Sequence, residues 1–208
     1  MRKHPRQERS RRLVDSLVDA TALAITCKGV DGLSANYVAE LAGVSQGSLY
    51  QYFENREDLL EALMERLADQ VTQLLYAHLS QADTTSSYEW LLGLMRVVSK
   101  LLHSNEGLYL ELLRNWHALP TRTLADAIQP RMVEMAQLYM RHFTPKRVLV
   151  DVPERLFICF NSVMFTMVRL YSQDRPVVRE EVVIQKLARM IDLFLADASG
   201  SRRNPEER

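Results

Sequence analysis

The sequence predicts an all-α protein of about nine helices, and three observations lead to that prediction. Glycine and proline are scarce, with seven of each among 208 residues, and no proline occurs between Pro5 and Pro120. Apolar residues recur at spacings of three and four through most of the chain, which is the period of an amphipathic helix. Hydrophobic residues make up 47% of the sequence, an ordinary share for a globular protein. Long segments with only local glycine or proline punctuation favour helices over strands.

Charge is balanced over the whole chain but not along it. The formal net charge is zero, whereas residues 1–12 contain six basic side chains against the single acid Glu8. A basic arm of this kind either follows phosphates or is a solvated, frayed terminus, and its position directly ahead of the short polar motif at residues 43–56 favours the phosphates. The helix that follows carries Asp15 and Asp19, so this start is unlike a secretory signal. No apolar run in the sequence approaches the length that spans a bilayer.

The first two helices are expected over residues 9–28 and 35–42. The first has an apolar stripe at helical spacing and ends at Gly29, a residue typical of helix ends. The second has apolar residues for an inward face, and Ser34 precedes it. A serine at that position can cap a helix by accepting a hydrogen bond from an otherwise unpaired N–H group. Together with the next helix they predict a compact three-helix unit.

A very short third helix is expected over residues 46–52, after a tight turn. Gly43 suits the turn because glycine enters positive φ without steric cost, and Ser45 can cap the helix. Leu49 and Phe53, four residues apart, give the helix one apolar face. We expect the opposite face to show amides, hydroxyls and phenols to solvent, from Gln46, Gly47, Ser48, Tyr50, Gln51 and Tyr52. Such a face suits the base edges and phosphates of the DNA major groove.

A fourth helix is expected from Asn55 to about Leu79, and its length makes it a mechanical link. Asn55 and Asp58 resemble a capping box. At 1.5 Å per residue the helix is roughly 36 Å long, enough to leave one unit and enter another. Further helices are expected at residues 88–103, 105–117, 120–143, 153–172 and 178–198, with Pro130 as a kink or restart. The predicted parts are a basic arm and helix-turn-helix domain, a helical effector-binding and dimerisation domain, and a disordered tail, at residues 1–54, 55–198 and 199–208.

The last two predicted helices are unusually apolar, and the earlier one is apolar almost all round. A helix that is hydrophobic on every side has to be buried on every side. Its cover is either a second copy of the chain or simply the chain's own core, and the sequence allows both. The residues expected at an interface between two copies are Met167, Leu170, Leu187, Met190 and Phe194.

An apolar cavity is a further expectation for the C-terminal part. Tryptophan and tyrosine, which combine an aromatic ring with one polar group, and flexible methionine side chains suit a small-molecule site. An ordinary hydrophobic core contains the same residues, however. The candidate lining residues are Trp90, Met95, Tyr109, Trp116, Met132, Met135, Tyr139, Phe157, Phe160 and Met164. Arg114, His117 and Arg122 lie near predicted helix ends and either meet a polar head group or are solvated charges.

The ordered motifs of the N-terminal part resemble the DNA-binding region of TetR-family transcriptional regulators. The resemblance covers about residues 10–65 and rests on Gly32-Leu33-Ser34, Val38-Ala39, Leu41-Ala42-Gly43-Val44-Ser45, Gly47-Ser48-Leu49-Tyr50, Tyr52-Phe53 and Glu57-Asp58-Leu59-Leu60. Three residues depart from the family pattern. Arg56 stands where Lys is usual, and Asn36 and Tyr37 fill positions that often carry Arg and Asp or Glu.

This resemblance implies a cytoplasmic bacterial regulator that binds a palindromic operator in double-stranded DNA as a homodimer and lies on the nucleoid when bound. Repression relieved by an apolar or amphipathic small-molecule effector is the expected outcome, with activation as the alternative. No cofactor, metal or membrane contact is implied. The expected DNA-contacting residues are Ser34, Asn36, Ser45, Gln46, Gly47, Ser48, Tyr50, Gln51, Tyr52 and Arg56. Of these, Gln46, Ser48 and Gln51 would meet bases. The phosphates would be held by Ser34, Ser45, Tyr50, Tyr52 and Arg56.

Two other classes of protein remain as alternatives. An enzyme is disfavoured because the histidines are scattered over different predicted helices and none pairs with a carboxylate at ligand spacing. An interaction adaptor or membrane-surface protein is disfavoured because the first helix carries acidic residues on its polar face. Cys27 and Cys159 are isolated, and we expect both to be buried thiols in a reducing cytoplasm.

Overall fold

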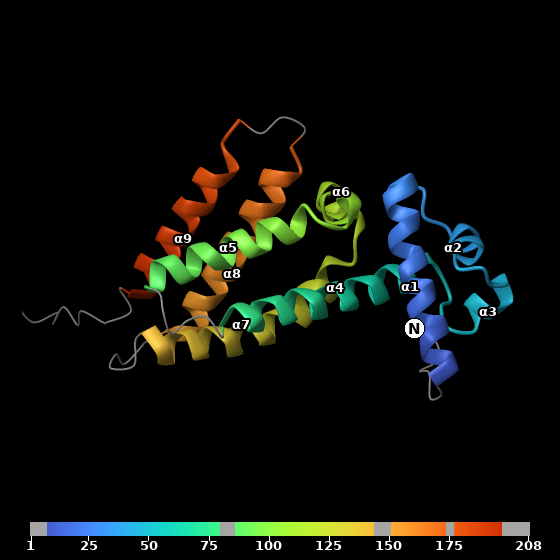
Figure 1. Ribbon diagram of the computed structural model, residues 1–208, viewed down its shortest axis with the longest axis horizontal. Helices are drawn as coiled ribbons and strands as arrows, with labels where there is room; N and C mark the ends of the chain where they lie inside the picture. Colours follow the sequence, from blue (N-terminus) through green and yellow to red (C-terminus); the bar gives the residue numbers. More distant parts are fainter. Residues whose placement is uncertain (1–7, 80–85, 144–150, 174–176, 197–208) are drawn as a thin grey trace, which may run out of the picture.

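The computed structural model describes residues 8–79, 86–143, 151–173 and 177–196. These residues form nine α-helices, two short 3₁₀ turns and no strand. A small three-helix head lies at one end of an elongated helical body (Figure 1). The helices are α1 (Glu8–Lys28), α2 (Ala35–Leu41), α3 (Gln46–Tyr50), α4 (Arg56–Leu79), α5 (Ser87–Leu102), α6 (Leu108–Arg114), α7 (Thr121–Phe143), α8 (Val152–Tyr171) and α9 (Glu180–Ala196).

The head consists of α1, α2 and α3, and its turns confirm the predicted caps. The Ser34 hydroxyl accepts a hydrogen bond from the backbone N–H of Tyr37, and the Ser45 hydroxyl accepts one from that of Ser48. Between α2 and α3, Gly43 has a φ of +65°. That conformation costs most residues energy because of their Cβ atom, so the glycine predicted for this turn is required there.

The core of the head reaches beyond the three helices. Leu17, Val38, Leu49 and Phe53 are fully buried and pack into one cluster with the first half of α4. The same cluster includes Leu108, Tyr109, Leu112 and Leu119 from α6 and the segment after it. The hydrophobic cluster of the head therefore includes residues on both sides of the domain boundary predicted after residue 54.

The body has a second core, built from α5, α8 and α9 with parts of α6 and α7. Its buried members include Trp90, Met95, Tyr139, Ile184 and Leu187. The long helix α4 runs out of the head along α7 (Figure 1), as its predicted length required. Its start is capped by Asn55, whose side-chain oxygen accepts a hydrogen bond of 2.8 Å from the backbone N–H of Asp58.

Several local expectations need correction. The predicted helix at 105–117 is regular only over Leu108–Arg114 and has a 3₁₀ turn on each side. Helix α7 is continuous through Pro130, which excludes the restart predicted there, while the kink predicted as the alternative stays a prediction. Cys159 is buried as expected, but Cys27 is exposed. The arm at residues 1–7 and the tail at residues 199–208 lie outside the described residues, and within the described ranges no helix has the length and apolarity to cross a membrane.

Candidate nucleic-acid interface and ligand cavities

The polar face of α3 lies at the outer end of the head. Gln46, Gly47 and Gln51 are exposed, and the Tyr50 ring is 42% exposed. In contrast, Leu49 is fully buried. A five-residue helix is not stable alone, so its orientation depends on this anchor and on its cap.

Hydroxyl groups cluster at the start of α3. The Ser45 and Ser48 oxygens are 2.9 Å apart, and the backbone N–H of Ser48 donates to Ser45 at 3.2 Å. Ser34 and Asn36, at the start of α2, are also exposed. The structure therefore leaves these predicted site residues accessible at two neighbouring helix starts, except that Ser48 is half-buried and bonded to the cap.

Two residues predicted to contact phosphates lie differently from the expectation. Tyr52 follows α3 in a turn and is only 6% exposed, as a member of the head's core. It does not belong to the solvent-facing set, because its side chain packs into the head's core. The Arg56 guanidinium turns inward and donates a hydrogen bond of 2.7 Å to the carbonyl oxygen of Val30. This contact fastens the start of α4 to the turn between α1 and α2.

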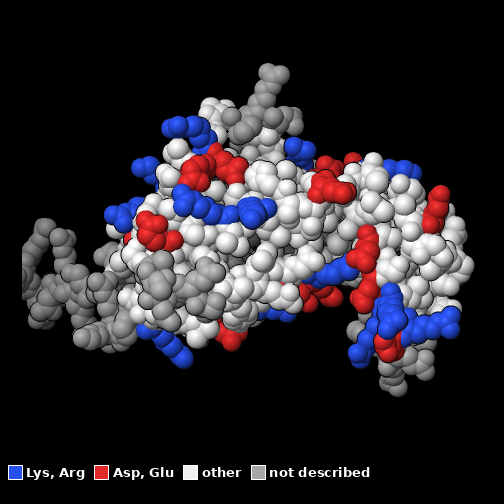
Figure 2. All heavy atoms as spheres, viewed as in Figure 1, with Lys and Arg blue, Asp and Glu red and all other residues white. Residues whose placement is uncertain are grey.

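Basic side chains gather at the N-terminal end of α1. Arg9, Arg11 and Arg12 are exposed there, and Arg12 pairs with Glu8. Figure 2 shows this cluster at the lower right of the molecule, below the nearly uncharged surface of the α2 and α3 region. Positive charge beside a neutral, hydrogen-bonding face is an arrangement suited to DNA, where phosphates flank the base edges.

One feature of the head was not predicted. The Lys28 ammonium lies 3.5 Å from the centroid of the Tyr37 ring, a cation–π contact. It joins the end of α1 to α2, close to exposed Ser34. The departure from the family pattern at Tyr37 was the only hint in the sequence that this residue has a special contact. The sequence could not identify Lys28, nine residues earlier, as its partner, because the fold brings the two together.

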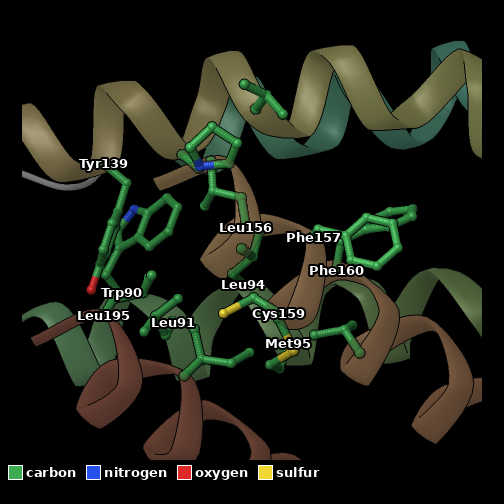
Figure 3. Close-up of a pocket in the computed structure, with 15 residues that line it drawn as sticks. Trp90, Leu91, Leu94, Met95, Tyr139, Leu156, Phe157, Cys159, Phe160 and Leu195 are labelled. Carbon is green, nitrogen blue, oxygen red and sulfur yellow. The ribbon is translucent and has the colours of Figure 1, made fainter. Parts of the chain in front are cut away.

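Among the described residues, two apolar cavities lie in the body, where the sequence predicted one lined by residues from both. The outer cavity has a volume of about 170 Å³ and lies between α5, α7, α8 and α9 (Figure 3). Its lining residues are Trp90, Leu91, Leu94, Met95, Val133, Ala136, Tyr139, Pro153, Leu156, Phe157, Cys159, Phe160, Val163, Ile191 and Leu195. Burial raises the pKa of the Cys159 thiol to about 11, so this side chain is a neutral part of the wall.

The inner cavity has a volume of about 150 Å³ and lies between α4, α5, α6 and α8. Tyr109, Trp116 and Met164 line this cavity, whereas Trp90 and Phe157 line the outer one. Met95 and Phe160 line both. The side chains of Met132, Met135 and Arg122 lie outside the described set, and Arg114 and His117 are exposed and line neither cavity.

Trp90 connects the outer cavity to the long helix. Its indole N–H donates to the carbonyl oxygen of His78 at 3.3 Å, and the His78 ring nitrogen lies 3.0 Å from the Trp90 carbonyl oxygen. The two rings are 5.1 Å apart between centroids. An alanine at Gly93 would bring its Cβ within 2.9 Å of the His78 ring, so this close approach needs the glycine.

The five residues predicted to lie at an interface between two copies differ in their burial. Met167, Leu170 and Leu187 are buried in the chain's own second core and cannot form a surface. Phe194 is half-buried against that core, and Met190 is exposed. The apolar side chains that α8 and α9 do leave exposed are Phe157, Ile158, Phe165, Met190 and Leu193.

Comparison with known proteins agrees with this geometry. The family described as bacterial regulatory proteins, tetR family, matches residues 17–63. The nucleoid occlusion factor SlmA of Actinobacillus pleuropneumoniae is 30% identical over 81 residues, 39% of this chain and 39% of that protein. The HTH-type transcriptional regulator TtgR of Pseudomonas putida is 31% identical over 80 residues, 38% of this chain and 36% of that protein. These matches span well under half the length of either curated relative.

The fold is shared over a much longer stretch. A Mesorhizobium loti structure, described as that of a TetR-family transcriptional regulator, superposes with a TM-score of 0.69 at 19% identity. The superposition covers 93% of this chain and all of that one. The family match is thus confined to residues 17–63 of the head, while the arrangement of head and body is the fold of the Mesorhizobium loti structure.

Proposed function

We propose that the protein is a transcriptional regulator that reads DNA by inserting α3 into the major groove. The observation that carries this proposal is the exposure of a polar five-residue helix, Gln46–Tyr50, which is held by its cap and by the buried Leu49. A helix that cannot persist alone is here kept facing outward. A recognition helix in a helix-turn-helix has that requirement.

The proposed contacts follow from where each side chain lies. We propose that the exposed Gln46 and Gln51 bond base edges and that Gly47 allows the backbone to come close. The exposed hydroxyls of Ser34, Ser45 and Tyr50, with Asn36 beside them and the basic end of α1, would hold phosphates. The exposed α3 face supports these roles, but burial removes Tyr52 from the set.

The test is DNase footprinting upstream of the protein's own gene, followed by titrations of the fragment found. Gln46→Ala should weaken the operator complex by about 1–3 kcal/mol and relax the preference at one or two base pairs. Gln137→Ala is the matched control, because it removes an exposed amide from α7 in the body. Equal losses on operator and random duplex would exclude base reading by Gln46.

Arg56 has a second proposed role, since its inward hydrogen bond to Val30 braces the head. A phosphate contact through its remaining N–H groups is still a prediction. Arg56→Lys keeps the charge but not the planar fork of donors. If bracing dominates, this variant should lose thermal stability as well as DNA affinity, whereas a pure phosphate role would lower affinity alone.

We also propose that two copies pair through the exposed apolar side chains of α8 and α9. Ile158, Phe165, Met190 and Leu193 are exposed on these two adjacent helices. A surface of this kind is costly to leave in water and is typical of an association site. Pairing would present two copies of α3 to one DNA duplex, as a palindromic operator requires.

Sedimentation of single-site variants tests the pairing. Phe165 is 65% exposed, so Phe165→Glu should fold normally yet sediment as a single chain. Leu138→Glu is the control, because Leu138 on α7 is a 37% exposed apolar residue outside the proposed interface. A paired Phe165→Glu protein, or a single-chain wild type at the same concentration, would show that this face is not the interface.

The regulatory outcome that we propose is repression in the cytoplasm, relieved by an apolar effector, with no catalytic step. The two cavities support an apolar ligand, and the reported match to TtgR supports a role in transcription. Effector and DNA need only favour different positions of the head, a coupling typically worth about 1–3 kcal/mol. Reporter expression from the footprinted promoter, with and without the gene, separates repression from activation.

A further inference from the structure

The surface formed by α2 and α3 has no basic side chain of its own. Between Lys28 and Arg56 the sequence contains neither lysine nor arginine, and this stretch includes all of both helices. Arg56 turns its guanidinium inward to the carbonyl oxygen of Val30. Phosphate contacts supply a large share of a protein's affinity for DNA, so the position of the nearest exposed cation matters for the proposed function.

Lys28, in the last turn of α1, reaches that surface through a contact with α2. Its ammonium lies 3.5 Å from the centroid of the Tyr37 ring. The backbone N–H of Tyr37 in turn donates a hydrogen bond of 3.3 Å to the Ser34 hydroxyl. One residue of α2 therefore contacts both this cation and a hydroxyl that we propose to hold phosphate.

The turn between α1 and α2 is packed directly against Lys28. A Cβ added at Gly32 would lie 2.5 Å from the carbonyl oxygen of Lys28 and 2.6 Å from its Cβ. The same turn is bonded to the start of α4 through Arg56 and Val30. Contacts on both sides thus fix the backbone from which the Lys28 side chain extends.

Tyr37 holds the ammonium without neutralising it. An aromatic ring attracts a cation through its quadrupole and has no net charge, whereas a carboxylate would cancel the positive charge. Burial raises the pKa of the Tyr37 phenol, and Cys27 and Glu40 raise it further, so the ring stays neutral. Lys28 is exposed and takes part in no ion pair with the residues that the structure describes. An ammonium has three N–H donors, and those that face away from the ring can bond a phosphate.

The exposed cations in the described part of the head lie at the two ends of α1. Arg12 and Lys28 are sixteen residues apart, which is roughly 24 Å along a helix. Helices α2 and α3 lie alongside α1, between the levels of its two ends (Figure 1). The span exceeds the major groove's width of about 12 Å, so the two ends can reach phosphates on opposite walls of the groove that α3 would enter.

From these contacts we infer that Lys28 is a phosphate-binding residue of the DNA interface and that Tyr37 is the positioning residue that holds it there. The inference rests on the proposed function, because it adds a residue to the same interface. A cation in the last turn of α1 also interacts favourably with the helix dipole, and that structural role requires no DNA. The two roles differ in whether they change the salt dependence of binding.

Salt dependence is measured by anisotropy titrations of a fluorescent duplex of random sequence at about 50–200 mM salt. Lys28→Gln removes the charge and keeps most of the stem. It should reduce the slope of log K against log salt by about 0.9 for each copy of the chain bound, which is roughly an eightfold loss of affinity per copy near 0.1 M. The footprinted operator should show the same change, because a phosphate contact does not depend on sequence.

Lys100→Gln is the matched control. Lys100 is exposed on α5 in the body, so its variant loses the same charge and should keep the slope of the wild type. Since Lys28 is also exposed, Lys28→Gln should fold, and thermal unfolding without DNA checks this. Lys28→Met, with an uncharged stem of similar length, is the second variant and should show the same loss of slope.

Substitutions of Tyr37 test the positioning role. Tyr37→Phe keeps the ring and should bind as the wild type does. Tyr37→Leu removes the ring and should weaken binding about two- to fivefold, the factor that corresponds to an exposed cation–π contact. In a Lys28→Gln background, Tyr37→Leu should cause no further loss, because the ammonium that it positions is already absent. A purely structural role would weaken binding in both backgrounds.

Two results would overturn the inference. An unchanged salt slope in Lys28→Gln would show that this ammonium contacts no phosphate. Equal losses from Tyr37→Leu in the two backgrounds would show that Tyr37 does not position it. A wild type that binds neither the random duplex nor the operator at about 50 mM salt would instead reject the proposed function itself, so the two failures are distinguishable.

Discussion

Gly47→Ala is expected to make the protein more stable and its DNA complex weaker. Gly47 lies in the first turn of α3, and its φ is not in the positive region that other residues avoid. A Cβ added there would meet only the Ser45 hydroxyl, at 3.9 Å, which is an ordinary contact. Nothing in the described part of the protein therefore requires glycine at this position, and the proposed reason for it is the approach of DNA.

The expected changes in folding stability and in DNA affinity have opposite signs. Replacing glycine by alanine inside a helix stabilises by about 0.5–1 kcal/mol, because glycine loses more conformational freedom on folding. The gain belongs at the lower end, since Gly47 is near the start of a five-residue helix. In the complex, the new methyl group would crowd a backbone that we propose lies against the base edges. Crowding of a packed contact costs about 1–3 kcal/mol, or roughly a 5- to 150-fold loss of affinity.

The assay combines urea denaturation of the free protein with anisotropy titrations of the footprinted operator at fixed salt. Gln137→Ala again serves as the control, because its exposed side chain is on α7. Unchanged operator affinity in Gly47→Ala would refute close approach of the backbone to DNA at this position. A lower free energy of unfolding would instead refute the conclusion that the protein has room for the methyl group.

Three further substitutions test individual features. Gly43→Ala should lower the free energy of unfolding by about 1–2 kcal/mol, because its φ of +65° is costly for a residue with a Cβ atom; Gly43→Asn should lower it less in the same urea titration. Gly93→Ala should push the His78 ring away from Trp90 and lower the Tm measured by calorimetry. For a chain of this size, each kcal/mol lost from the free energy of unfolding lowers Tm by about 2–4 °C. The Cys159 pKa of about 11 means that the unfolded thiol ionises first as pH rises. The stability of wild type relative to Cys159→Ala should therefore be constant below about pH 8 and fall by up to about 3 kcal/mol by about pH 11. An alkaline urea series in which the two proteins change in parallel would contradict this.

The sequence by itself was sufficient for features that depend on near neighbours in the chain. Periodicity and scarce glycine predicted the nine helices of the described residues, mostly to within two residues. The caps at Ser34, Ser45 and Asn55 were predictable because a cap joins groups three residues apart. The motif residues of the head also indicated the family, since their spacing is local to residues 10–65.

Only the tertiary structure decided which side chains the neighbouring helices cover. Tyr52 was expected to be exposed but is buried, and Cys27 was expected to be buried but is exposed. The reason is that the end of α3 and the end of α1 each turn a particular side toward the core. On α8, apolar residues lie all round, so periodicity could not say that Met167 faces inward while Phe165 faces outward.

The separation of the two apolar cavities has the same origin. A cavity is the space that remains between α4, α5, α6 and α8 after they have packed. The spacing of residues along one helix therefore cannot predict its position or size. The dual place of α6, with Leu112 in one core and Leu113 in the other, likewise depends on contacts between distant segments. Local patterns set each helix and its ends, because those energies arise within a few residues. The surfaces, cavities and links between cores depend on how all the helices pack together.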